Sequence, residues 1–391
     1  MVMLNRILST IIAAFVCVAV SAQGVCIING NIADDRMSDG SKIKKLTLTR
    51  TDELGRTIEV ATAKVKKGKY AFRYELAKDE PVFMYAIKGF GEGNDVEVFV
   101  EPGEVAVNTN SNMSSIATGT PTNDLYLKYC ATCNDDSILP FAKDILERKH
   151  GAGWFATPEG KDALNRIARE SIKIKANLLR MLIDNNASPM TPLMIERWLP
   201  LLTPAYADQM VNTIHVDLQK HPYYLSLRNK VLANDMKVGN EVPDITLPLS
   251  SGEVKKLSDY RGKYVVLNFW ANGCTKSDEM IAEMKNLYNV VKENQDQFII
   301  ISVALESDAA AWQGALQSNG MGGEGWLNAC DLVGADSHAA KLFGVAQAPK
   351  IILVEQEGRA VSLDMDIDEV VMRVEQILSG DLYYFDQAEY K

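Results

Sequence analysis

Short runs in which apolar and polar residues alternate dominate residues 24–120. The runs at 46–49, 70–74 and 96–100 follow a two-residue period, and glycines or a Pro-Gly turn separate them. This pattern is typical of strands joined by hairpins, with one face in a core and the other in water. Residues 23–121 are therefore predicted to form an antiparallel β-sandwich-like domain.

Helical periodicity replaces this alternation in residues 122–237. Residues 122–124 can cap a helix that runs toward Cys133, and apolar residues recur every three or four positions through 160–184. The segment 205–219 predicts a further helix, and prolines separate these segments. We expect a helical connector between two domains.

Strands and helices alternate over residues 238–380. The predicted elements are strands at 264–270 and 298–305, helices at 274–295 and 309–317, a hairpin of 350–354 with 361–363, and an amphipathic helix at 367–378. Nearly continuous apolar strands between helices indicate a central mixed sheet with helices on both faces. The chain as a whole is predicted to combine α+β and α/β domains.

The two ends of the chain differ from the body. Arg6 precedes an apolar run of about 14 residues, and small residues at 20–22 offer a cleavage site. Because a membrane-spanning helix needs about 20 apolar residues, we interpret residues 1–22 as a secretory signal peptide, with a retained membrane anchor as the alternative. Residues 381–391 are predicted to be a C-terminal tail.

Composition limits the class of partner. The chain is 47% hydrophobic and 24% charged, and its formal net charge is −10. Such an acidic chain has no electrostatic reason to bind nucleic acid or anionic lipid.

Five cysteines follow the leader: Cys26, Cys130, Cys133, Cys274 and Cys330. An odd number in an exported protein leaves at least one thiol free or paired with another molecule.

Three segments of the last domain carry a distinctive set of motifs. Val-Pro-Asp at 242–244 precedes Leu-Ser-Asp-Tyr-Arg-Gly-Lys at 257–263, then Asn-Phe-Trp-Ala-Asn-Gly-Cys-Thr-Lys-Ser at 268–277, then Gly-Val-Ala-Gln-Ala-Pro at 344–349. In this order they resemble the TlpA-like periplasmic thioredoxins of the AhpC/TSA group. Residues 30–129 resemble a β domain of unknown function that precedes such thioredoxins in some Gram-negative secreted proteins.

This resemblance implies a thioredoxin fold over residues 238–380 and a location in the periplasm or cell envelope of a Gram-negative bacterium. It also implies that Cys274 is the nucleophile and that Ala348 and Pro349, joined by a cis bond, position the substrate. No cofactor and no metal are implied. The expected partners are cell-envelope proteins or a membrane thiol reductant.

The active-site motif departs from the Trp-Cys-x-x-Cys pattern of the family. Gly273 stands in the place of the tryptophan, and Ser277 in the place of the second cysteine. In a dithiol site the second cysteine attacks the mixed disulfide and releases the product, which Ser277 cannot do. The predicted function is therefore monothiol thiol–disulfide exchange through Cys274, with resolution by an outside thiol.

The position of Cys274 favours a reactive thiol. It lies where a strand gives way to a helix, so unpaired N–H groups and the helix dipole favour the thiolate. Lys276 and the Ser277 hydroxyl would add to this effect, whereas Asp278 and Glu279 would oppose it. The sequence thus predicts a lowered pKa for Cys274.

Two other functions compete with this one. A peroxiredoxin-like peroxidase would need a threonine three residues before Cys274 and a proline further back, where this chain has Ala271 and Leu267. A redox-inactive thioredoxin-fold protein that recognises peptides or surface partners is the other alternative.

A second CxxC motif, Cys130 and Cys133, lies in the helical connector. It could resolve a Cys274 adduct, form half of a metal site, or supply two small apolar side chains late in a helix. No second CxxC or histidine pair completes a metal site, which favours the structural interpretation. Cys330 falls at a predicted strand end and is expected to be buried.

Overall fold

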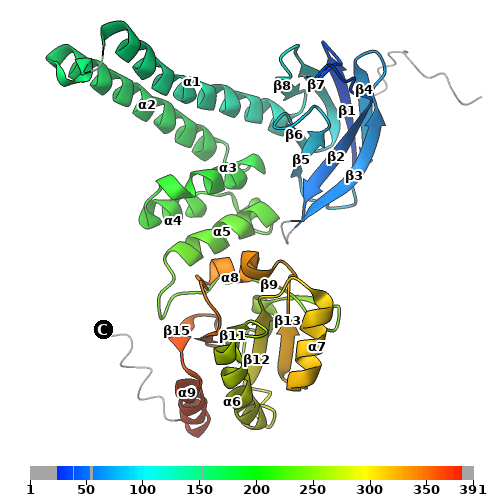
Figure 1. The fold of residues 1–391 in the computed structure, drawn as a ribbon, viewed down its shortest axis with the longest axis vertical. Helices are drawn as coiled ribbons and strands as arrows, with labels where there is room; N and C mark the ends of the chain where they lie inside the picture. The colour runs from blue at the N-terminus through cyan, green and yellow to red at the C-terminus, as the bar shows by residue number, and fades with distance from the viewer. Residues whose placement is uncertain (1–23, 38, 53–55, 152, 381–391) are drawn as a thin grey trace, which may run out of the picture.

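The computed structural model describes residues 24–37, 39–52, 56–151 and 153–380, apart from the side chains of 135–141. The chain forms a β domain, a set of helices and a C-terminal α/β domain. In Figure 1 the β domain and the two long helices lie at one end of the long axis, the shorter helices in the middle, and the C-terminal domain at the other end. The predicted leader, 1–22, and the predicted tail, 381–391, lie outside the described residues. Among those described, no helix is both long and apolar enough to cross a bilayer.

The N-terminal domain is a sandwich of two four-stranded sheets, which confirms the predicted class. The first sheet has the order β4 (Lys69–Glu75), β1 (Val25–Ile32), β7 (Gly103–Thr109), β8 (Ser115–Thr118). The second has the order β3 (Thr57–Lys64), β2 (Lys45–Thr51), β5 (Phe83–Lys88), β6 (Val96–Val100). Alternate side chains such as Ile28, Leu48 and Val98 are fully buried between the sheets.

One strand pair differs from the antiparallel arrangement expected from the sequence. β1 and β7 run parallel, from Cys26 opposite Gly103 to Ile32 opposite Thr109. Parallel neighbours need a crossover connection, and here the intervening strands of the second sheet provide it. Turn signals between successive strands predict hairpins, but they do not show which strands lie side by side after a crossover.

The helical part contains α1 (Pro121–His150), α2 (Pro158–Asp184), α3 (Met190–Trp198), α4 (Pro204–Asn212) and α5 (Pro222–Asn234). α1 and α2 pack together as a hairpin that projects from the body, and α3–α5 lie between the two domains (Figure 1). The predicted helix 205–219 is wrong beyond Asn212, where the chain turns and forms a 3-10 turn at Val216–Leu218. The outer face of the second sheet packs on these helices through Met84 and Phe99.

The bounds of α1 differ from the prediction at both ends. It begins at Pro121 rather than after 122–124, because Thr120 is the N-cap and proline suits the first turn. It also continues past Cys133 to His150, where Gly151 with φ of +91° follows it. The apolar residues of this helix do not gather on one face, so periodicity gives no sign of its full length. Cys130 and Cys133 therefore lie in the first half of the helix, not late in it.

The C-terminal domain has a five-stranded sheet with the order β13 (Trp326–Ala329), β12 (Phe298–Ala304), β11 (Tyr264–Trp270), β14 (Lys350–Val354), β15 (Ala360–Met365). β11, β12 and β13 are parallel, whereas β14 and β15 are antiparallel to their neighbours. A two-stranded ribbon, β9 (Thr246–Pro248) with β10 (Val254–Lys256), precedes the sheet. The predicted mixed sheet is confirmed.

Helices cover both faces of this sheet. α6 (Thr275–Val291), α7 (Ala309–Asn319) and α9 (Ile367–Ser379) share one apolar cluster with it. α8 (His338–Leu342) and the segment 242–257 share the cluster on the other face. Every residue of β12 is buried, which explains its nearly continuous apolar sequence. The result is a thioredoxin-like fold.

Candidate active site

Cys274 lies at the junction between the central strand and the helix that follows it. β11 ends at Trp270, and Cys274 is the N-cap residue of α6, with its side chain only partly buried. Gly273 immediately before it has φ of +72°, and a Cβ at that position would meet no other atom within 4 Å. The glycine therefore both permits the turn and leaves the thiol without a bulky flank.

Ser277 supplies the strongest local stabilisation of a thiolate on Cys274. The backbone N–H of Ser277, then its hydroxyl and the N–H of Lys276, hold the pKa of the Cys274 thiol below its ordinary value. The Asp278 carboxylate opposes them. Lys276 thus acts through its backbone N–H, although the sequence suggested its side chain.

The Ser277 hydroxyl is held in place from its other side. Ser277 is fully buried, and its Oγ accepts a hydrogen bond of 3.3 Å from the N–H of Ala271. A hydroxyl has one proton and two lone pairs, so Ser277 can accept from Ala271 and at the same time donate its proton to the Cys274 sulfur. Ser277 is therefore a hydrogen-bond donor to the sulfur and is itself shielded from solvent.

The loop before β14 contacts the thiol. The peptide bond between Ala348 and Pro349 is cis, as the family resemblance implies. The Cys274 thiol donates to the Ala348 carbonyl oxygen at an S···O distance of 3.7 Å. On the far side of the loop, Lys350 Nζ donates to the Phe343 carbonyl oxygen at 3.2 Å. The structure thus brings Cys274, Ser277, Ala348 and Pro349 together.

Glu306 is a site residue that the sequence analysis missed. Its Oε1 accepts a hydrogen bond of 2.9 Å from the N–H of Asn272, in the loop between β11 and Cys274. Its carbonyl oxygen accepts from the Cys330 thiol, with an S···O distance of 3.4 Å. The only sequence signal is its place just after β12, whose carboxyl end lies beside that of β11. Glu306 positions the loop that carries the cysteine.

Asn268 is the polar group buried in β11. It is fully buried, its Nδ2 donates to Met280 Sδ at 3.4 Å, and its Oδ1 has no partner among the described residues. An amide does not ionise, so this position supplies no proton to the sulfur. Proton exchange at Cys274 therefore depends on the open side of the site.

The other cysteines lie in different environments. Cys130 and Cys133 pack with the helical cluster on α1, which α3–α5 separate from α6 (Figure 1), so the structure does not bring them to Cys274. Burial raises the pKa of Cys130 and of Cys330, and raises that of Cys26 to about 11. Cys330 follows β13 and is 3% exposed, which confirms its predicted burial. The five described cysteines form no disulfide with one another.

We expect the alkylation of Cys274 to show its lowered pKa directly. The rate of reaction with iodoacetamide follows the thiolate population, so its pH profile should inflect below the value of a free cysteine, about 8.5. Ser277→Ala removes the hydroxyl but keeps the backbone N–H, so its inflection should move upward without reaching the free value. Mass spectrometry of the 274-containing peptide measures the rate at each pH. A wild-type inflection above that of free cysteine contradicts the assignment.

Two segments of the chain match families of known proteins. Residues 238–362 match the AhpC/TSA family, and residues 26–126 match a domain of unknown function, DUF4369. The chain is 26% identical over 126 residues to the thiol-disulfide oxidoreductase ResA of Bacillus thuringiensis subsp. konkukian. This match covers 32% of this chain and 68% of the relative. It is 36% identical over 69 residues to the thioredoxin-like protein YneN of Bacillus subtilis, covering 18% of this chain and 39% of the relative.

Two solved structures also resemble part of this chain. A thiol-disulfide oxidoreductase from Bacteroides fragilis is 28% identical, with a TM-score of 0.33, and the match covers 35% of this chain and 99% of that one. The C-terminal domain of a putative thiol-disulfide oxidoreductase from Bacteroides thetaiotaomicron is 24% identical, with a TM-score of 0.34, and the match covers 37% and 97%.

Proposed function

We propose, from the AhpC/TSA-family domain that residues 238–362 form, that this protein carries out monothiol thiol–disulfide exchange through Cys274. The observation that carries the proposal is the environment of the sulfur. Cys274 is partly exposed, two N–H groups and a hydroxyl stabilise its thiolate, and its sulfur contacts the carbonyl oxygen that precedes Pro349. A merely structural cysteine is typically buried with a raised pKa, as Cys26 is here.

The reaction balances with one protein thiol and one outside thiol. The Cys274 thiolate attacks a substrate disulfide, an S–S bond forms between Cys274 and the substrate, and the other substrate sulfur leaves as a thiolate that takes a proton. Ser277 cannot attack the resulting mixed disulfide. An external thiolate attacks the substrate sulfur of that mixed disulfide: a new S–S bond forms between the external thiol and the substrate, the Cys274–substrate bond breaks, and Cys274 leaves as the thiolate.

Each residue of the site has a part in the first step. Ser277 donates to the Cys274 sulfur and so favours the attacking thiolate. Glu306 holds the loop through Asn272. We assign Ala348 and Pro349 the positioning of the substrate, because the carbonyl oxygen of Ala348 already lies at the sulfur. The same geometry would serve a redox-inactive recognition site, so the test must detect the covalent adduct itself.

The proposed setting is outside the cytoplasm, in the periplasm or cell envelope of a Gram-negative bacterium. It rests on the leader-like pattern of residues 1–22. The proposed substrates are envelope proteins with accessible disulfides, and the proposed resolving thiol belongs to an envelope reductant.

Trapping of the mixed disulfide tests this function. Cells that export the full chain are quenched with acid, free thiols are alkylated, and adducts are separated without reductant. Wild-type protein should give adducts of higher mass that dithiothreitol releases. Cys274→Ser should abolish them, whereas the matched double variant Cys130→Ser/Cys133→Ser should retain them.

Two outcomes would overturn the proposal. Absence of adducts on wild-type protein, together with a slow alkylation of Cys274, would favour the redox-inactive recognition protein. Adducts that survive Cys274→Ser but disappear in the double variant would place the chemistry on α1 instead.

A further inference from the structure

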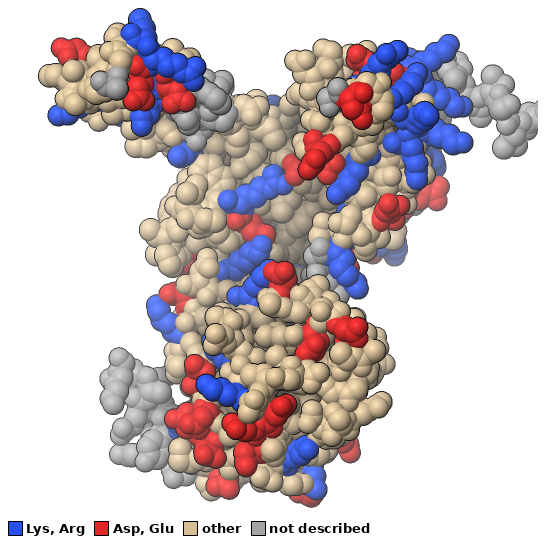
Figure 2. Space-filling model, viewed as in Figure 1, with Lys and Arg blue, Asp and Glu red and all other residues tan. Residues whose placement is uncertain are grey.

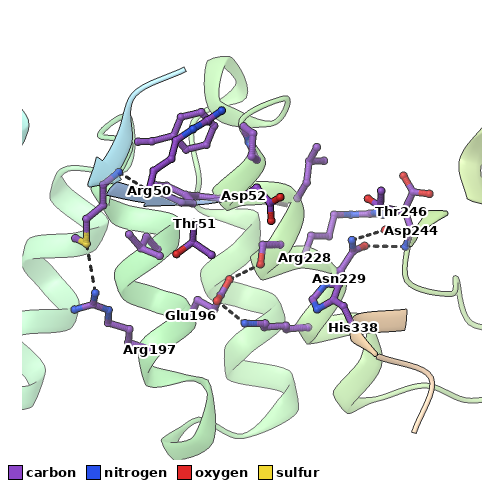
Figure 3. Close-up of a pocket in the computed structure, with 18 of the residues that line it drawn as sticks. Arg50, Thr51, Asp52, Glu196, Arg197, Arg228, Asn229, Asp244, Thr246 and His338 are labelled. Atoms are coloured by element: carbon purple, nitrogen blue, oxygen red, sulfur yellow. Dashed lines mark hydrogen bonds and ion pairs between the residues drawn. The ribbon is translucent and has the colours of Figure 1, made fainter. Parts of the chain in front are cut away.

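A cavity of about 950 Å³ lies where the three parts of the chain meet. Its lining comes from β2 and β5 of the sandwich, from α3 and α5, from the segment 241–261, and from His338 at the start of α8 (Figure 3). Figure 2 shows basic and acidic side chains alternating along the junction between the helices and the C-terminal domain. The cavity is distinct from the Cys274 site, since neither Cys274 nor Pro349 lines it.

The carboxylates of this cavity are already satisfied within the protein. Six acidic residues line it, and each has a partner: Asp52 with Arg56, Asp95 with Lys88, Glu97 with Arg197, Glu196 with Lys230, Glu241 with Arg228, and Asp244 with the N–H and hydroxyl of Ser258. A cationic ligand would therefore have to compete with these partners for every one of the acids.

Three of the lining cations, in contrast, have no carboxylate within ion-pair distance among the described residues. They are Arg50, Lys220 and Lys256. The Arg50 guanidinium lies over the Phe83 ring at 5.3 Å from its centroid, which holds it against the sheet. The Thr246 hydroxyl and the His338 ring also line the cavity and have no hydrogen-bond partner in the described part of the chain.

These cations come from all three parts of the chain. Arg50 belongs to β2, Lys220 to the turn before α5, and Lys256 to β10. Eight lysines and arginines line the cavity against six acids, on a chain whose formal net charge is −10. A cavity of opposite sign to the whole protein concentrates anions locally.

The size of the cavity limits the ligand. Ligand pockets typically have volumes of about 300–1,000 Å³, whereas a folded partner needs a face of about 800 Å². The cavity thus fits a small molecule or a short peptide. We propose that it binds a small polyanion, with at least two carboxylate or phosphate groups, through Arg50, Lys220 and Lys256. Such a ligand contacts the sandwich, the connector and the thioredoxin-like domain at once.

Calorimetric titration of the full chain at low ionic strength tests this site. The probes are tetraglutamate for carboxylates and tripolyphosphate for phosphates, with tetralysine as the charge-reversed control. At least one polyanion should bind saturably with one site per chain, and the stronger of the two identifies the anion class. Arg50→Gln/Lys256→Gln should weaken that binding by at least about tenfold, since hydrogen bonds between charged groups are the strong ones.

A charge-matched variant distinguishes binding in the cavity from the effect of the protein's overall charge. Lys285→Gln/Lys292→Gln removes two charges from exposed positions on α6 and directly after it, outside the cavity, and should leave binding within about twofold because exposed charges are screened. Equal losses in the two double variants, or no saturable binding of either polyanion, would overturn the proposal. So would binding of tetralysine as tight as that of the polyanions. None of these measurements depends on the reactivity of Cys274.

Discussion

Replacing Ser277 with cysteine is expected to raise insulin-reducing turnover by at least about tenfold, from a wild-type level close to the uncatalysed rate. The wild-type protein can form a mixed disulfide but cannot resolve it alone. A thiol at position 277 would lie at the site of the hydroxyl that donates to Cys274, so it could attack that disulfide. Because residue 277 is fully buried, the new thiol would act in resolution rather than in the first attack.

The insulin turbidity assay with dithiothreitol as the reductant measures this change. Ser277→Ala is the matched control, because it removes the hydroxyl without adding a thiol, and its turnover should stay at or below that of the wild type. Dithiothreitol can resolve the wild-type adduct only by a slower bimolecular reaction, so wild-type turnover as fast as that of Ser277→Cys would contradict the monothiol mechanism. Loss of such turnover in Cys130→Ser/Cys133→Ser would then identify the resolving pair.

The second large effect concerns stability. Asn123→Ala is expected to destabilise the junction between the sandwich and α1 by about 2–4 kcal/mol. Asn123 is 1% exposed, its Oδ1 accepts from the N–H of Phe99 at 2.9 Å, and its Nδ2 donates to the Phe99 carbonyl oxygen at 2.8 Å. The side chain thus bonds β6 as a neighbouring strand would. Alanine leaves both backbone groups of Phe99 buried without a partner.

Hydrogen–deuterium exchange locates this effect within a chain of several domains. Amides of β6 should exchange faster in Asn123→Ala, while those of β11, in the other domain, should be unchanged. Asn286→Ala, at an exposed position of α6, should change stability by less than about 0.5 kcal/mol. Unchanged protection of β6 would show that the Asn123 bonds contribute little.

The sequence predicts the C-terminal domain well because its signals are local. Buried parallel strands need nearly continuous apolar residues, and the loop that places Cys274 before a helix is contiguous in the chain. The Ala348–Pro349 segment could be predicted only through the family resemblance. The contact of Ala348 with Cys274 joins residues 74 positions apart, which periodicity does not report.

The features that the sequence did not reveal depend on long-range contacts. Glu306 reaches Asn272 only because β12 lies beside β11, and the parallel pairing of β1 with β7 follows a crossover. The residues at 122–124 look like a helix cap, yet the Asn123 side chain bonds to a strand. The interdomain cavity draws on three separate parts of the chain, so no single segment indicates it.

The α1–α2 hairpin affects how the whole molecule diffuses. A helix of 30 residues is about 45 Å long at 1.5 Å per residue, and this one carries its partner away from the body (Figure 1). Frictional drag rises with such elongation at constant mass. A single 43.2 kDa chain therefore has a larger Stokes radius than a compact sphere of equal mass, and light scattering reports its subunit number more faithfully than elution volume does.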